Sequence, residues 1–281
     1  MNEEAPERVR TRAAGLWSHV CGWEDLLVPL DVAPGQMTLV MGEGWTRRWS
    51  VTWRSGGGEV SCAVRDLAQM PLVDGGPTRW FSWRRGQRHR PGLQFLVSTG
   101  RHHGAESLEE ARVLLALDFA GDLIDVVSQP LKLRFQTGQR HREHTPDFLA
   151  VTRSGTWLID VRPRKLVRSE DLESFAATAE VALVCGWRYM VAAEWRTHVL
   201  TALDAFSAQR RQLGDPLSLR SALLVSAGQG LSFGELVDTT PFPPVARAQL
   251  LHLLWHRRLG ADLGGPFGDA SLVVSPGGPG R

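Results

Sequence analysis

The sequence predicts a mixed α/β fold, and three patterns along the chain point to it. Residues 50–64 contain two alternating runs joined by a Ser-Gly-Gly-Gly tip, which predicts a β-hairpin. The middle of the chain alternates between strand-like and helix-like periodicity. The last third contains short apolar helices separated by Gly and Pro turns. We therefore expect an α/β core between a β-rich N-terminal region and a helical C-terminal region.

The N-terminal region is expected to span residues 1–76, because a turn cluster at Asp74–Pro77 follows the hairpin. The core is expected to span residues 77–200. It begins with a strand at 92–100, and Gly104 is interpreted as a break. A helix at 105–119 starts with a capping-box pattern at Ser107-x-x-Glu110.

The rest of the core is expected to contribute strands and one more helix. The pattern predicts a strand at 124–135 that is broken at Pro130, and two strands at 144–152 and 156–163 around a Ser-Gly turn. A helix at 169–183 has an acidic first turn, which suits the positive end of the helix dipole. A final strand is predicted at 187–193.

The C-terminal region, residues 201–274, has the outline of a winged helix. A linker helix at 201–213 precedes three predicted helices, and a late strand at 270–274 follows them. The three helices are predicted at 217–227, 231–240 and 244–263. Residues 275–281 are expected to be disordered because they are rich in Gly and Pro.

The composition is that of a globular protein, with 43% hydrophobic and 22% charged residues. Apolar runs reach only about 8–10 residues, well short of the ~20 that a membrane span needs. No signal-peptide pattern opens the sequence, so we expect a cytoplasmic protein without membrane association. Three widely spaced cysteines suggest no disulfide framework.

Positive charge is concentrated in one stretch although the net charge is only +2. Residues 77–167 hold 15 Lys and Arg against 9 Asp and Glu, and residues 79–90 hold five arginines and no acid. A GC-rich genome would also raise the arginine content. The clustering nevertheless favours contact with DNA phosphates, and the residues that we expect to make it are Arg84, Arg85, Arg88, Arg140, Arg142 and His144.

Two predicted strands bring acidic residues together. Asp147 lies at the start of one strand, and Asp160-x-Arg162 ends the next, so Asp160 and Arg162 share one face. Two adjacent carboxylates would raise a pKa unless a cation lies between them. Mg²⁺ takes few protein carboxylates and fills its other positions with water and phosphate oxygens. A neighbouring basic group can stabilise charge on the reacting phosphate. An exposed Asp–Arg ion pair is the alternative interpretation.

A longer series of motifs carries a resemblance to a known family. In order, the chain contains Glu106-Ser-Leu-Glu-Glu110, Ser128-Gln-Pro130, Arg142-x-His144-x-Pro-Asp147-Phe148, Ile159-Asp-Val-Arg-Pro163 and Cys185-Gly-Trp187. This series resembles the TnsA-like endonuclease subunits of heteromeric transposases, which belong to the PD-(D/E)xK nuclease superfamily. The resemblance runs from roughly Trp80 to Arg196 and extends more loosely to the C-terminal residues.

The resemblance implies a restriction-endonuclease-like domain followed by a winged-helix domain. It implies a Mg²⁺-dependent enzyme that cuts the 5′ ends of a transposable element by phosphodiester hydrolysis, with Mn²⁺ able to substitute. Its partners would be double-stranded DNA, an integrase-type transposase subunit and an ATPase regulator. The implied catalytic residues are Glu110, Asp147, Asp160 and Arg162, with the three acids as metal ligands.

One position departs from the family pattern, because many members have lysine where this chain has Arg162. Arginine keeps its proton and cannot act as a base, although it can hold a phosphate. Lys165 is a weaker candidate for that role because its strand parity is wrong. Glu106 competes with Glu110 as the helix acid. Two alternatives remain open: a non-catalytic DNA-bridging subunit, and a stand-alone restriction or repair nuclease.

Histidines and the last helix complete the candidates. His102, His103, His141 and His144 have neither a nearby cysteine nor helical HxxxH spacing, so we expect no zinc there. The third C-terminal helix ends in His252, His256, Arg257 and Arg258. In a winged helix this helix enters the DNA major groove, which makes Arg257 and Arg258 candidate DNA contacts. A cationic helix C-terminus, favoured by the dipole, is the alternative.

Overall fold

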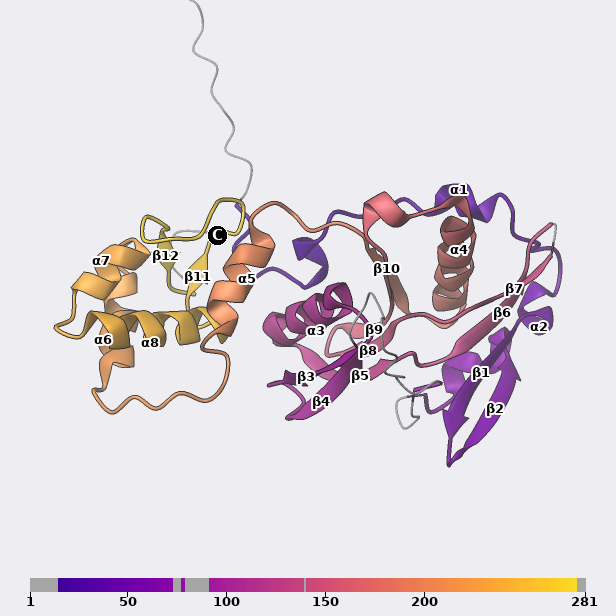
Figure 1. The fold of residues 1–281 in the computed structure, drawn as a ribbon, viewed down its shortest axis with the longest axis horizontal. Helices are drawn as coiled ribbons and strands as arrows, with labels where there is room; N and C mark the ends of the chain where they lie inside the picture. Colours follow the sequence, from indigo (N-terminus) through magenta and orange to yellow (C-terminus); the bar gives the residue numbers. More distant parts are fainter. Residues whose placement is uncertain (1–14, 73–76, 79–90, 139, 277–281) are drawn as a thin grey trace, which may run out of the picture.

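The structure is a computed structural model that describes residues 15–72, 77–78, 91–138 and 140–276. It is a mixed α/β protein with two four-stranded sheets (Figure 1). The first sheet has the order β2-β1-β6-β7 and the second the order β10-β9-β8-β5. A separate hairpin, β3-β4, lies beside the second sheet, and a helical C-terminal part lies at the opposite end of the molecule from the first sheet.

The first sheet joins the N-terminal hairpin to a later hairpin. Strands β1 (Ser50–Ser55) and β2 (Gly58–Ala63) form the hairpin that the sequence predicts. β1 also pairs with β6 (Lys132–Gln136), which pairs with β7 (His141–His144). Trp49, Val51 and Trp53 pack against Leu133 and Phe135 in one buried cluster. The N-terminal hairpin therefore shares its core with the middle of the chain.

The second sheet is mixed and carries the acidic strands. Strands β5 (Leu123–Ser128), β8 (Phe148–Thr152) and β9 (Gly155–Val161) are antiparallel neighbours, whereas β10 (Arg188–Ala192) runs parallel to β9. β3 (Gly92–Leu96) pairs with β4 (Arg101–Ala105).

Helices α3 (Leu108–Ala120) and α4 (Ser169–Val184) pack on opposite faces of the second sheet. Phe148 and Ile159 contact the α3 side, whereas Leu149 and Leu158 contact the α4 side. This alternation follows from the two-residue period of a strand. The sheet is therefore buried on both sides, and Asp160 lies near the end of β9.

Short helical segments complete the N-terminal and middle parts. They are a 3-10 turn at Glu24–Leu26, α1 (Ala33–Gln36), α2 (Trp45–Arg48), and 3-10 turns at Val64–Gln69 and Arg164–Leu166.

The break predicted at Pro130 is confirmed, and β5 and β6 on its two sides lie in different sheets. Gln129, just before Pro130, has a left-handed φ of 48°. Other boundary predictions are wrong. The predicted strand 144–152 is likewise interrupted between β7 and β8. Gly104 lies within β4 and does not end it. The last predicted helix stops at Trp255, and Arg257 beyond it has a φ of 57°.

The C-terminal part contains α5 (Val199–Ser207), α6 (Leu219–Ala227), α7 (Phe233–Asp238) and α8 (Pro243–Trp255). A short ladder of β11 (Gly260–Ala261) and β12 (Val273–Val274) follows, and a bridge joins Ser232 to Leu272.

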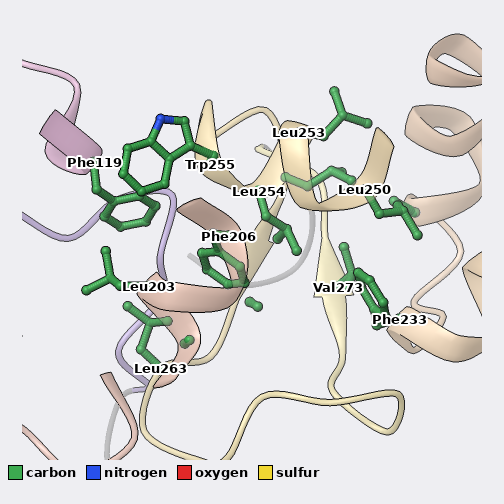
Figure 2. Close-up of a cluster of buried hydrophobic side chains, with 14 of the residues drawn as sticks. Phe119, Leu203, Phe206, Phe233, Leu250, Leu253, Leu254, Trp255, Leu263 and Val273 are labelled. Carbon is green, nitrogen blue, oxygen red and sulfur yellow. The ribbon is translucent and has the colours of Figure 1, made fainter. Parts of the chain in front are cut away.

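Figure 2 shows the buried cluster that holds this part together, and it includes Phe119 from α3. The Phe119 ring lies 5.4 Å from the Trp255 ring, centroid to centroid. The end of α3 is thus part of the C-terminal core. Within the described ranges, no helix combines the length and apolar character that crossing a bilayer requires.

Candidate acidic site at the end of the second sheet

Asp147 is fixed by backbone contacts on two sides. Pro146 cannot donate to a ladder, and here the chain leaves β7 of the first sheet and enters the second sheet at Phe148. The Asp147 amide donates to the Ile159 carbonyl at 3.0 Å, and the Gln129 amide donates to the Asp147 carbonyl at 2.7 Å. The Val161 amide donates to Asp147 Oδ2 at 2.7 Å. The carboxyl group is therefore held against β9.

Asp160 lies in β9, where only 1% of its surface is exposed. Its Oδ2 accepts a hydrogen bond from the Tyr189 hydroxyl of β10 at 2.7 Å. Its Oδ1 lies 2.8 Å from His144 Nε2 at the end of β7. Both oxygens of this buried carboxylate thus have a partner, and the His144 ring lies edge-on to Phe175 of α4.

Glu110 lies in the first turn of α3 and is 8% exposed. The Ser107 side chain caps the helix by accepting from the Glu110 amide, as the sequence predicts. The Glu110 carboxylate in turn accepts from the Glu106 amide at 2.7 Å and from the Ser107 hydroxyl at 2.9 Å. These contacts turn the carboxylate back over the helix start.

Electrostatic coupling connects the three acids. Burial is the largest cause that raises the pKa of Asp147 well above its usual 3.8, followed by the charges of Asp160 and then Glu110. The Val161 hydrogen bond acts in the opposite direction, and Glu106 contributes least. Burial, together with Asp160, also raises the pKa of Tyr189, which keeps this hydroxyl protonated as a donor. Glu110 is thus the helix acid with the stronger influence on Asp147.

Arg162 follows this group at the end of β9. Its Nε lies 3.4 Å from Asp171 Oδ2 in the first turn of α4, without completing a hydrogen bond. About two fifths of its side chain, 39%, is exposed. Lys165 lies exposed in the 3-10 turn at Arg164–Leu166.

The carboxylate oxygens of these residues determine whether they suit a divalent cation. In the described part of the chain, no three or more His, Cys, Asp or Glu side chains are arranged as a ready-made metal site. Asp160 and Glu110 use their oxygens in hydrogen bonds. Asp147 Oδ1, by contrast, accepts no hydrogen bond from any described residue. Oxygen donors in a group of buried acids suit Mg²⁺, which needs few protein ligands.

The structure separates the predicted DNA-contacting residues into distinct environments. Arg84, Arg85 and Arg88 lie outside the described residues. Arg142 forms an ion pair with Glu173 and is largely buried, whereas Arg140 lies 3.6 Å from Glu170 on the surface. His144 contacts Asp160 instead of facing solvent.

The two C-terminal candidates also differ. Arg257 donates to the backbone carbonyls of Ala120 and Cys21, so it joins the C-terminal part to the end of α3. Arg258 is exposed.

Tyr189 and Asp171 are site residues that sequence reasoning missed. Tyr189 is the one tyrosine of the sequence, and it lies in the predicted strand 187–193. Its position in that strand was a usable signal, but only the parallel pairing of Tyr189 with Leu158 places it beside Asp160. No family profile and no curated protein matches this chain.

Proposed function

We propose that the chain is a metal-dependent DNA endonuclease, the subunit of a heteromeric transposase that cuts the 5′ ends of a transposable element. The observation that carries this proposal is the crowding of Asp147 against Asp160 and Glu110 at one end of a mixed sheet. Three neighbouring carboxylates without a cation beside them repel one another, and this repulsion destabilises the folded protein. Strongly perturbed acids of this kind are concentrated at functional sites.

Asp147 and Glu110 are the residues that would hold Mg²⁺ or Mn²⁺. Asp160 would add its negative charge next to Asp147. The bound cation would supply Lewis-acid activation of water and of the scissile phosphate. Asp147 would offer Oδ1, which accepts no hydrogen bond from the described residues, while the Val161 amide holds Oδ2 in place. Glu110 would turn from its capping contacts toward Asp147, which needs the loss of a hydrogen bond to Ser107 or Glu106.

Arg162 and the partners of Asp160 have supporting roles in this proposal. Arg162 keeps its proton and would bind the phosphate that gains charge during hydrolysis. His144 and Tyr189 hold Asp160 in one orientation, so its charge is directed at Asp147 without conformational freedom. The site would therefore stabilise charge rather than exchange a proton at position 162.

The arrangement of elements agrees with this proposal. A mixed sheet with helices on both faces is compatible with a restriction-endonuclease-like core. We propose that the C-terminal part is a winged-helix-like domain, and the order α6, Ser232 bridge, α7, α8, β11, β12 supports this. We propose double-stranded DNA, an integrase-type transposase subunit and an ATPase regulator as partners, and the cytoplasm as the location.

The test is strand-specific mapping of nicks on DNA that carries the element's ends, with the partner transposase and Mg²⁺ present. The wild-type chain should nick the 5′ ends, and Asp147→Asn should not. Glu109→Gln is the matched control, because Glu109 lies beside Glu110 on α3 but forms an ion pair with Arg112. No 5′ nicks from the wild type, with the partner's 3′ cuts intact, would exclude the endonuclease.

A second candidate function has one observation in its favour. Both oxygens of Asp160 are engaged by His144 and Tyr189, and lysine is replaced by Arg162. A non-catalytic subunit that keeps the nuclease fold and bridges DNA to its partners would show this arrangement. The nick-mapping assay separates the two candidates, because a bridging subunit would stimulate 3′ cutting while making no nick itself.

A further inference from the structure

Two histidines lie one turn apart at the end of α8, far along the chain from the acidic site. His252 is in the last turn of the helix, and His256 is its C-cap. Their ring centroids are 4.3 Å apart, with the planes tilted by 60°. Residues at positions i and i+4 share one helix face, and two histidines at this spacing are a recurrent zinc-binding element.

A backbone carbonyl group orients the His252 ring. His252 Nδ1 lies 2.9 Å from the Gln209 carbonyl oxygen. Because a carbonyl can only accept, the contacting nitrogen of His252 must carry the proton, which leaves the lone pair of neutral imidazole on Nε2. Histidines that bind metals are commonly held in this way by their second nitrogen.

A pocket leaves His256 accessible. His256 lines a pocket of about 260 Å³ between the C-terminal helices and the end of α3, and Asp118 and Arg153 also line it. His256 is exposed, so its ring can be reached from solvent.

We propose that His252 and His256 form a site for a zinc-class transition-metal ion, independent of the acidic site and of the proposed endonuclease activity. Imidazole nitrogen suits Zn²⁺, Ni²⁺ and Cu²⁺, whereas Mg²⁺ prefers oxygen. Two protein ligands leave further positions for water or for a group from a partner.

The test is a Zn²⁺ titration of the full-length, tag-free chain by calorimetry in excess Mg²⁺, which occupies oxygen sites. The wild type should bind one ion per chain. His252→Gln and His256→Gln should each weaken binding by at least about tenfold, the size of loss seen when a metal site is disturbed. His141→Gln, at an exposed histidine of β7, should leave the affinity unchanged.

A second measurement covers variants that fail to fold. Histidine NMR signals of the wild-type chain should shift at His252 and His256 when Zn²⁺ is added, and Cu²⁺ should give an electron paramagnetic resonance spectrum of two-nitrogen coordination. Equal Zn²⁺ affinity in the wild type and both variants would overturn the proposal. Shifts confined to other histidines, or no binding by the wild type, would also overturn it.

Discussion

The Val161 amide donates a hydrogen bond of 2.7 Å to Asp147 Oδ2, so the acid that precedes β8 is fixed to the end of β9. Val161 lies between Asp160 and Arg162, and this one contact therefore sets the position of Asp147 relative to both. It also opposes the burial and the neighbouring charges that raise the pKa of Asp147.

Asp147→Asn should stabilise the protein at neutral pH in the absence of divalent ions. The pKa of Asp147 is raised in the folded state, so its contribution to stability is present below the unfolded value near 3.8 and is lost as pH rises. The difference in free energy of unfolding between variant and wild type should grow from about pH 4 upward. Urea unfolding at several pH values measures it, and Glu109→Gln should show no such growth.

Tyr189→Phe should destabilise the protein by about 1–3 kcal/mol, because it leaves one oxygen of a buried carboxylate without its donor. The ring itself would still pack in its place. Chemical denaturation measures the loss. A change within about 0.5 kcal/mol, typical of a surface substitution, would show that the Tyr189 hydroxyl does not support Asp160.

Arg162→Ala should lower DNA cleavage by about 10²–10³-fold, the cost of losing one donor to a charged transition state. Arg162→Lys should keep or raise the activity, because it retains the positive charge. Arg164→Ala is the matched control, since Arg164 lies two residues further along and forms an ion pair with Glu194. Cleavage by Arg162→Ala at the wild-type rate would remove Arg162 from the proposed site.

Arg257→Ala should reduce stability, whereas Arg258→Ala should not. Arg257 donates to two backbone carbonyls and lies over the Phe119 ring, and hydrogen bonds of a charged group each contribute about 1.5–3 kcal/mol. Thermal unfolding of both variants gives the comparison. If Arg258 contacts DNA phosphates as predicted, its removal should instead reduce the salt dependence of DNA binding.

Local sequence patterns were sufficient to predict those elements whose sequence signals lie within a few residues of one another. The hairpin at 50–64 and the Ser107 cap of α3 are both confirmed. The helix predicted at 169–183 is α4, at Ser169–Val184. In each case a turn, a cap or a helical period lies within a few residues, and these features are physically determined by neighbours along the chain.

Features that depend on distant pairing could not be predicted in this way. Nothing in residues 50–55 indicates that β1 would pair with β6 about eighty residues later. The same holds for Asp160, whose partners come from β7 and β10. Strand parity predicted that Asp160 and Arg162 share one face, and in the structure Arg162 lies on the side of α4. Parity could not show that His144 and Tyr189 occupy both oxygens of Asp160.

The most direct test of the central claim is a calorimetric titration of the chain with Mn²⁺, carried out in a His252→Gln background so that the acidic site is measured alone. The His252→Gln chain with Asp147 intact should bind Mn²⁺. The same chain with the additional substitution Asp147→Asn should stay folded and should not bind Mn²⁺. Glu109→Gln in the same background should bind as before. Equal Mn²⁺ affinity with Asp and with Asn at position 147 would contradict the account, because no cation would then lie among these three acids.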